Sequence, residues 1–172
     1  MAAKAGVKHK VFCGSMCDVM DDEAPEGERK KLWNLVNATP NLIWQLLTKR
    51  PQRYTRELPH RFVHRNVWLG VSAENQATYN LRWPVLSWHK YCRGYTVFIS
   101  YEPALGPVST LEANQHEKYG FPDWLICGGE SGPVQRPMEV EWAEHISREC
   151  EENKVAFFMK QMAERNPFEG TS

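Results

Sequence analysis

The chain has 172 residues, and its 21 Lys and Arg are balanced by 21 Asp and Glu, so the formal net charge is zero. A zero net charge excludes a strong overall field toward nucleic acid or a membrane surface, although a local basic patch stays compatible with it. No apolar stretch is long enough to cross a bilayer, and the first residues lack the apolar run of a signal peptide, so a cytoplasmic protein without a membrane partner is expected.

The first half of the chain alternates short apolar runs with helical patterns. A buried strand is predicted at residues 11–15, and a loop rich in Asp and Pro separates it from a helix at 28–38. A strand at 41–47, a short polar helix at 51–58 and a strand at 66–71 follow.

The second half repeats the alternation. Residues 77–88 form a helical pattern that Pro84 is expected to break or kink. Strands are predicted at 95–100, 123–127 and 156–159, and the clearest helix pattern of the chain covers 139–153.

Strands that alternate with helices predict an α/β fold. Most of the apolar runs are nearly continuous, which is typical of parallel strands covered on both faces. Six strands are about two short of a closed eight-stranded barrel, so we predict a partial (β/α) barrel, TIM-barrel-like, of about six parallel strands. Residues 8–162 are expected to form this single incomplete domain, residues 163–172 a flexible tail, and residues 11–15 an exposed strand edge.

The five cysteines are scattered and odd in number, which argues against a disulfide framework and fits a reducing compartment. Cys13 and Cys17 form a pair, but a tetrahedral zinc site needs four ligands, and no second close pair accompanies them. No native metal site is therefore predicted.

Five of the predicted strands end in short polar tips, and parallel α/β folds place their sites at the carboxyl ends of strands. The first tip carries Lys49 and Arg50, two cations that suit a phosphate or carboxylate, or else a solvated loop. Because adjacent strand residues point to opposite faces, only one of the two is expected to face the site.

The next two tips are acidic and polar. Glu74 and Asn75 follow one strand, and Ser100 and Glu102 end the next. Convergent carboxylates could serve in acid–base chemistry or hold ribose hydroxyls or a metal. Structural ion pairs with the neighbouring Lys and Arg side chains explain the same residues equally well.

The fourth tip is the glycine-rich segment Gly128, Gly129, Glu130, Ser131 and Gly132. Its N–H groups could cradle an anion while Glu130 binds an ammonium or hydroxyl group, and the alternative is a tight turn capped by Ser131. The segment matches neither a dinucleotide fingerprint nor a Walker loop.

Two further cations complete the candidate ligand-binding set, and no catalytic residue is assigned. Arg136 follows the glycine-rich segment, and Lys160 ends the last strand. Each could clamp a carboxylate or phosphate, and a surface role is equally compatible with its position.

Taken in order, these tips and the runs before them resemble the uncharacterised phage-protein family called gp thirty-seven/gp sixty-eight, which also occurs in bacterial genomes. The resemblance covers about residues 8–162. It is carried by seven collinear segments, which are residues 11–18, 46–51, 66–72, 102–107, 123–132, 136–138 and 157–161.

The resemblance implies a radical S-adenosylmethionine-like protein. Family members carry an amino-terminal three-Cys motif for an iron–sulfur cluster, and this chain, which holds no such motif, is expected to begin after it. The expected function is therefore the carboxy-terminal part of such a protein, which binds S-adenosylmethionine or another polar, nucleotide-like ligand at the strand ends and is inactive alone, with no cluster of its own.

The alternative is a non-catalytic, phage-derived module that binds a host protein or nucleic acid. The partners expected under these hypotheses are a three-Cys segment or partner chain, a second copy joined through the exposed strand edge, and a nucleotide or nucleic acid.

Overall fold

The structure, a computed structural model, describes residues 8–14, 17–59, 66–112 and 115–162. The predicted flexible tail at 163–172 lies outside the described residues. The elements in chain order are β1 (His9–Cys13), α1 (Glu28–Ala38), β2 (Leu42–Thr48), η2 (Pro51–Arg53), α2 (Tyr54–Glu57), β3 (Val67–Ser72), α3 (Gln76–Arg93), β4 (Thr96–Tyr101), α4 (Gln115–Tyr119), β5 (Trp124–Gly128), α5 (Val140–Glu152) and β6 (Ala156–Gln161).

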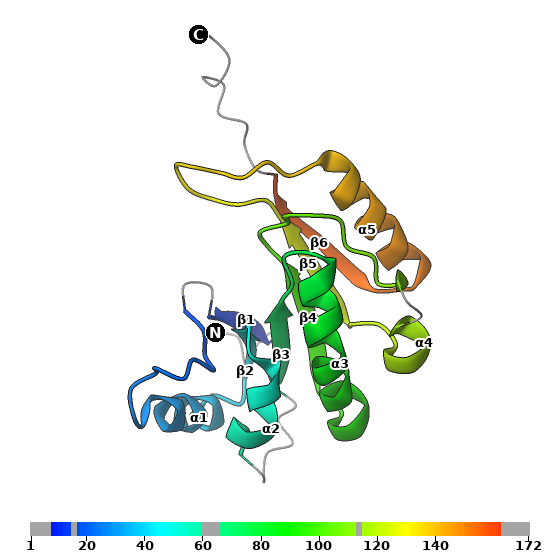
Figure 1. The fold of residues 1–172 in the computed structure, drawn as a ribbon. Coiled ribbons are helices and arrows are strands. Elements are labelled where there is room, and N and C mark those ends of the chain that lie inside the picture. The colour runs from blue at the N-terminus through cyan, green and yellow to red at the C-terminus, as the bar shows by residue number, and fades with distance from the viewer. Residues whose placement is uncertain (1–7, 15–16, 60–65, 113–114, 163–172) are drawn as a thin grey trace.

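The described strands form one six-stranded sheet in the sequential order β1-β2-β3-β4-β5-β6, and every neighbouring pair is parallel. The sheet curls into a half-barrel that leaves β1 and β6 as its two edges (Figure 1). The predicted α/β fold, a partial barrel of about six parallel strands, is confirmed. All six carboxyl ends consequently meet along one rim.

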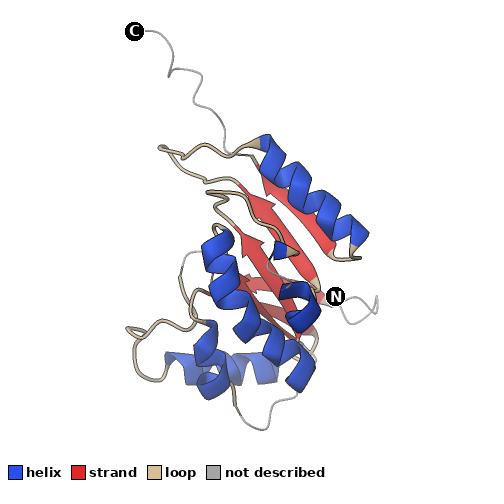
Figure 2. Ribbon diagram, turned by 45° about the vertical axis from the view of Figure 1, so that its right-hand side comes forward, coloured by secondary structure: helices blue, strands red, loops and turns tan. Residues whose placement is uncertain are grey.

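The sequential strand order also decides where the helices lie. Because the crossovers between parallel strands are right-handed, a sheet whose strands follow one another in chain order carries all of its crossover helices on the same face. Helix α3 packs on β3 and β4, and α5 packs on β5 and β6 (Figure 2). The main core lies between these helices and the sheet, and it includes Trp83, Leu86 and Ile146.

Helix α3 differs from its predicted form because it continues through Pro84 to Arg93. Its amino end is fixed by a capping box, in which the Asn75 side chain accepts from the Thr78 N–H at 3.0 Å. Gly94 ends it at a φ of 72°, a left-handed conformation that favours glycine. Pro84 therefore lies inside an 18-residue helix rather than at its end.

A second, smaller apolar cluster occupies the opposite face of the sheet. It consists of buried Leu47, Phe98 and Ile126 with partly buried Trp68 and Trp124. None of the helices in the described ranges is both long and apolar enough to cross a membrane.

Candidate functional site

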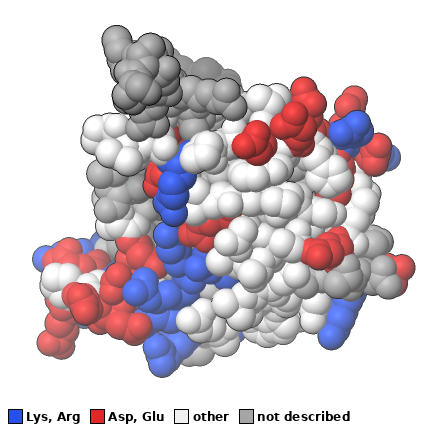
Figure 3. All heavy atoms as spheres, turned by 45° about the horizontal axis from the view of Figure 1, so that its top comes forward, with Lys and Arg blue, Asp and Glu red and all other residues white. Residues whose placement is uncertain are grey.

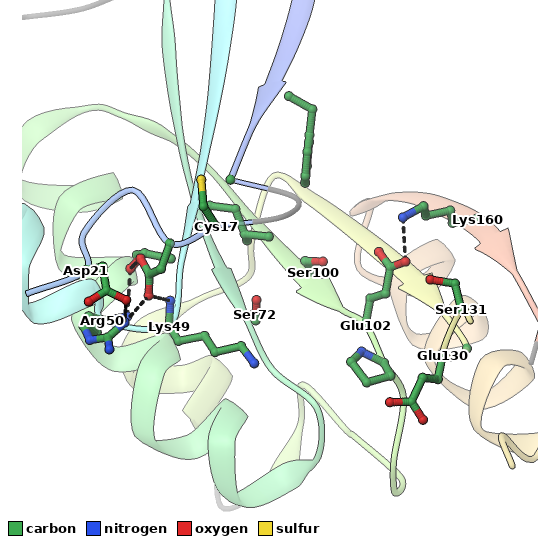
Figure 4. A pocket seen from close by; sticks show the side chains of 17 residues that line it. Cys17, Asp21, Lys49, Arg50, Ser72, Ser100, Glu102, Glu130, Ser131 and Lys160 are labelled. Atoms are coloured by element: carbon green, nitrogen blue, oxygen red, sulfur yellow. Dashed lines mark hydrogen bonds and ion pairs between the residues drawn. The ribbon is translucent and has the colours of Figure 1, made fainter. Parts of the chain in front are cut away.

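A pocket of about 780 Å³ lies where the strands end. Figure 4 shows Lys49 and Arg50 on the β2 side, Glu102, Glu130, Ser131 and Lys160 on the opposite side, and Ser72 and Ser100 between them. The charged side chains that line the pocket are Asp18, Asp21, Lys49, Arg50, Glu102, Glu130 and Lys160. The strand-end rim therefore brings together groups of both charge signs.

The pair of Glu102 and Lys160 joins the β4 and β6 sides of the pocket. Lys160 Nζ donates to Glu102 Oε1 at 2.6 Å, and the carboxylate side chain is the less exposed of the two. Burial, assisted by the negative charge of Glu102, raises the pKa of the Cys127 thiol to about 12. Cys127 thus stays protonated at neutral pH, which makes it a poor nucleophile.

Asp18 organises the β2 side of the pocket. Its carboxylate accepts hydrogen bonds from the Thr48 hydroxyl at 2.5 Å and from Arg50 Nη1 at 2.6 Å, and it also accepts from the N–H groups of Met20 and Lys49. Burial opposes ionisation of Asp18, but these donors outweigh it and hold the pKa of the carboxyl below its ordinary value. Arg50 is therefore oriented by an acidic partner.

Lys49 reaches the mouth of the pocket from the same tip. Its Nζ lies 3.0 Å from Glu74 Oε1, and Arg82 Nη1 lies 2.9 Å from Glu74 Oε2. Burial disfavours the charged form of Glu74, but Lys49 and Arg82 together keep the pKa of its carboxyl below the ordinary value. Both Lys49 and Arg50 line the pocket, but Figure 4 shows the Lys49 side chain extending across its mouth and the Arg50 side chain lying beside Asp21, so the expectation that one of the two faces the site stays a prediction.

Polar groups of the glycine-rich segment already form hydrogen bonds with neighbouring parts of the chain. Arg136 donates to Glu130 Oε2 from its backbone N at 2.9 Å and from Nε at 2.8 Å, and this partner lowers the pKa of Glu130 to about 2. The Gly129 N–H donates to the Gln161 carbonyl at 2.9 Å. Glu130 and the Gly129 amide are thus already engaged by neighbouring groups of the chain.

The predicted residues fall into two groups in the structure. Those that line the pocket are Lys49, Arg50, Ser100, Glu102, Gly129, Glu130, Ser131 and Lys160. The others lie beside it: Glu74 holds Lys49, Asn75 caps α3, Gly128 ends β5, and Arg136 holds Glu130.

The pocket also contains residues that the sequence did not single out as ligands. Ser72 ends β3 and pairs in register with Ser100, so the same alternation that indicated Ser100 could have indicated it. Asp18, Asp21 and Phe12 also line the pocket. No local pattern marks these three, because their place depends on how β1 and its loop pack against β2.

Space-filling atoms show the charge pattern of the strand-end surface. Lys and Arg form a band across it, with Asp and Glu close beside the band (Figure 3). Such a surface attracts a ligand of mixed charge better than a polyanion, because each cation has an acidic neighbour.

The cysteines of the described ranges do not fit an iron–sulfur cluster. Such a cluster needs three thiolates, whereas Cys17 is the one cysteine among the described residues that line the pocket, and burial together with Cys17 raises the pKa of Cys13. Across the described residues, no group of three or more His, Cys, Asp or Glu side chains is placed to hold a metal ion.

Comparison with family models gives a match over residues 2–169 to a family described as "Protein of unknown function (DUF5131)". Comparisons with curated proteins and with solved structures give no match.

Proposed function

The chain belongs to the DUF5131 family of proteins of unknown function, and on that premise we propose that its strand-end pocket binds a small ligand with both cationic and anionic groups. S-adenosylmethionine is the ligand we propose. It carries a carboxylate, an ammonium and a sulfonium group, which together give it one net positive charge. The proposal assigns binding to this chain and no reductive cleavage of the ligand.

The charge balance of the pocket supports a ligand of this kind. Three cations and four carboxylates line it, and each of these cations lies within ion-pair distance of a carboxylate. A polyphosphate would need a surplus of positive charge, because burying several negative charges without it is costly. A ligand with one net positive charge matches the single surplus carboxylate.

The observation that carries the proposal is the ion pair of Glu102 and Lys160 on the pocket wall. An α-amino acid group presents an ammonium and a carboxylate side by side. Its ammonium can take the place of Lys160 beside Glu102 while its carboxylate takes the place of Glu102 beside Lys160. Glu102 would accept from the ligand ammonium, and Lys160 would donate to the ligand carboxylate. The hydroxyls of Ser72 and Ser100 are the neighbouring groups suited to ribose hydroxyls.

The resemblance to the phage-protein family adds support from the sequence. The segments that carry it include the ends of β1, β2, β3, β5 and β6 and the residues that follow β4, and together they supply most of the pocket lining. A radical S-adenosylmethionine-like protein would use such a rim to hold the cofactor while thiolates from elsewhere hold the cluster. This chain would then supply the ligand-binding part of the site.

The alternative, a non-catalytic module that binds a host protein or nucleic acid, is favoured by a separate observation. The face of the sheet opposite α3 and α5 carries aromatic side chains with no helix of the described ranges packed over them. This face adjoins the strand-end pocket, whose lining includes Phe12, and it offers rings rather than the charges that carry the first proposal.

Isothermal titration with S-adenosylmethionine tests the proposed function. We expect binding at ligand concentrations of about 1 mM or below, and a loss of roughly tenfold or more in Glu102→Gln, because a charged hydrogen bond is removed. Glu28→Gln is the matched control, since Glu28 pairs with Lys31 on α1 away from the pocket. Absence of heat from the folded wild-type chain would contradict the proposal.

A further inference from the structure

The face of the sheet opposite the helices forms a continuous aromatic layer, which we call the inner face. Its positions follow from the pairing register, because residues paired across neighbouring parallel strands point the same way. Phe12, Gln45 and Trp68 are paired in register, as are Gly70, Phe98 and Trp124. The intervening strand residues pack instead into the helix-covered core.

The rings of this layer touch one another from one edge of the sheet to the other. Ring centroids lie 6.0 Å apart for Phe12 and Phe98, 5.7 Å for Phe98 and Trp124, and 6.5 Å for Trp124 and Phe158. Trp68 lies 6.0 Å from Trp124. The chain of contacts thus reaches from β1 to β6 across the half-barrel.

Exposure of the rings is greatest at the two edges of the layer. Phe12 is 38% exposed and Phe158 is 51% exposed, whereas Phe98 in the middle is fully covered. Gly70 permits this arrangement, since a Cβ atom there would meet the Phe98 ring. Large exposed rings in a continuous layer mark a binding surface rather than isolated surface residues.

The charges of the inner face are all positive. Among the strand residues that point to this face, the charged ones are Lys10 on β1 and Lys160 on β6. Lys160 is paired with Glu102 at the strand-end rim, whereas Lys10 lies over the rings and forms no ion pair with a carboxylate of the described residues. Lys10 Nζ lies 4.7 Å from the Trp68 ring centroid and 5.7 Å from that of Trp124. The cation is thus held directly over the aromatic layer.

From this juxtaposition we propose that the inner face binds single-stranded nucleic acid. The bases stack on the exposed rings, and a backbone phosphate pairs with Lys10. Base stacking on aromatic side chains beside cations is the general mode of single-strand binding, and it needs little sequence specificity. A duplex keeps its bases stacked on each other and offers this layer only its phosphates.

The charges also argue against the same face binding a second copy of the chain. A symmetric contact brings identical surfaces together, so two inner faces would place two copies of Lys10 in one interface, and the strand residues of this face supply no carboxylate to neutralise them. A polyanion supplies the missing negative charge. The proposal concerns the inner face and does not depend on S-adenosylmethionine binding at the strand ends.

Fluorescence anisotropy with a labelled oligothymidylate of about twelve nucleotides tests the proposal. We expect the wild-type chain to bind it at protein concentrations below about 100 µM and to bind a duplex of the same length more weakly. Phe158→Ala should weaken binding roughly fivefold or more, since it removes one stacking platform. Tyr91→Ala is the matched control, because Tyr91 is a 59% exposed ring on α3, outside the inner face.

Salt dependence isolates Lys10. With one phosphate contact, a fourfold rise in salt should lower the wild-type affinity about threefold, and in Lys10→Gln the same rise should leave the affinity nearly unchanged. Lys31→Gln on α1 should behave as the wild type does. Circular dichroism of each variant establishes that it is folded before its affinity is compared.

Two results would overturn the proposal. One is an anisotropy titration in which the folded wild-type chain gives no change or binds no better than Phe158→Ala. The other is a dimer in light scattering that Phe158→Ala dissociates, which would assign the inner face to a second copy. Neither result bears on the calorimetric test of the strand-end pocket.

Discussion

Lys160 Nζ lies 2.6 Å from Glu102 Oε1, although the two residues are 58 positions apart in the chain. The pair spans β5 and ties the end of β6 to the residue that follows β4. It is partly exposed, so its contribution to folding is small and its importance lies in the pocket.

Lys160→Met should therefore separate binding from stability. We expect the free energy of unfolding in urea to change by less than about 1 kcal/mol, because exposed ion pairs contribute little. Binding of S-adenosylmethionine should weaken clearly in the same protein. Lys31→Met, which breaks the exposed pair with Glu28, is the control. Unchanged ligand affinity in the folded Lys160→Met variant would show that the pair is outside the binding site.

Asp18→Asn should destabilise the chain by about 1–3 kcal/mol, because it weakens charged hydrogen bonds that the carboxylate accepts. The pKa of Asp18 is lower in the folded state than its ordinary 3.8, so its contribution is full above that value and is lost as the pH falls below it. The difference in unfolding free energy between wild type and variant should therefore be largest near neutral pH. A difference that grows below about pH 4 would contradict this account.

His89 should make the protein sensitive to mild acid. Burial, with a smaller effect of Arg93, lowers its pKa from 6.5 to about 4, and its other neighbours are the Thr55 hydroxyl and the rings of Tyr54, Trp88 and Tyr95.

The unfolded chain binds a proton at His89 before the folded one does, so stability is full above the ordinary pKa and falls as the pH drops toward 4. We expect a loss of about 2 kcal/mol between pH 7 and pH 5, and His89→Phe should lack this part of the loss. Urea unfolding of both proteins at the two pH values measures it. Equal pH dependence in the two proteins would rule out His89 as the group responsible.

Gly70→Ala adds a single methyl group, and it should nevertheless lower the free energy of unfolding strongly. The added Cβ would overlap Phe98 Cζ, and the Phe98 ring is fully buried, so the ring or the strand must shift. Overpacking of this kind costs about 1–3 kcal/mol. Gly106→Ala is the matched control, because its Cβ would meet an atom only at an ordinary 3.7 Å. Similar unfolding midpoints for the two variants would contradict the packing described for the inner face.

The fold was largely predictable because parallel strands buried by helices give continuous apolar runs, and all six runs became strands. Helix α3 passed through Pro84 because tertiary packing of residues such as Trp83 and Leu86 outweighs the local penalty of proline. The short helix α4 was not predicted, since five polar residues give no clear period.

The site was predictable only in part, for a physical reason. Strand alternation indicates which residues reach the rim, but partners come from distant loops. Nothing in the glycine-rich segment shows that Arg136 folds back onto Glu130. Nor does the sequence around Asp18 show that its carboxylate reaches Thr48, which lies 30 positions away. The inner face was missed as well, because a continuous apolar run does not reveal which of its two faces lacks a helix.

Chemical-shift mapping by nuclear magnetic resonance tests the central claim most directly. The ¹⁵N-labelled chain is titrated with S-adenosylmethionine, and the backbone amide shifts are followed residue by residue. The account predicts changes concentrated at the ends of β3, β4, β5 and β6, around Ser72, Ser100, Glu102, Gly129 and Lys160, with α1 unaffected. Saturating ligand that leaves these amides unmoved, or moves only amides on the helices, would contradict it.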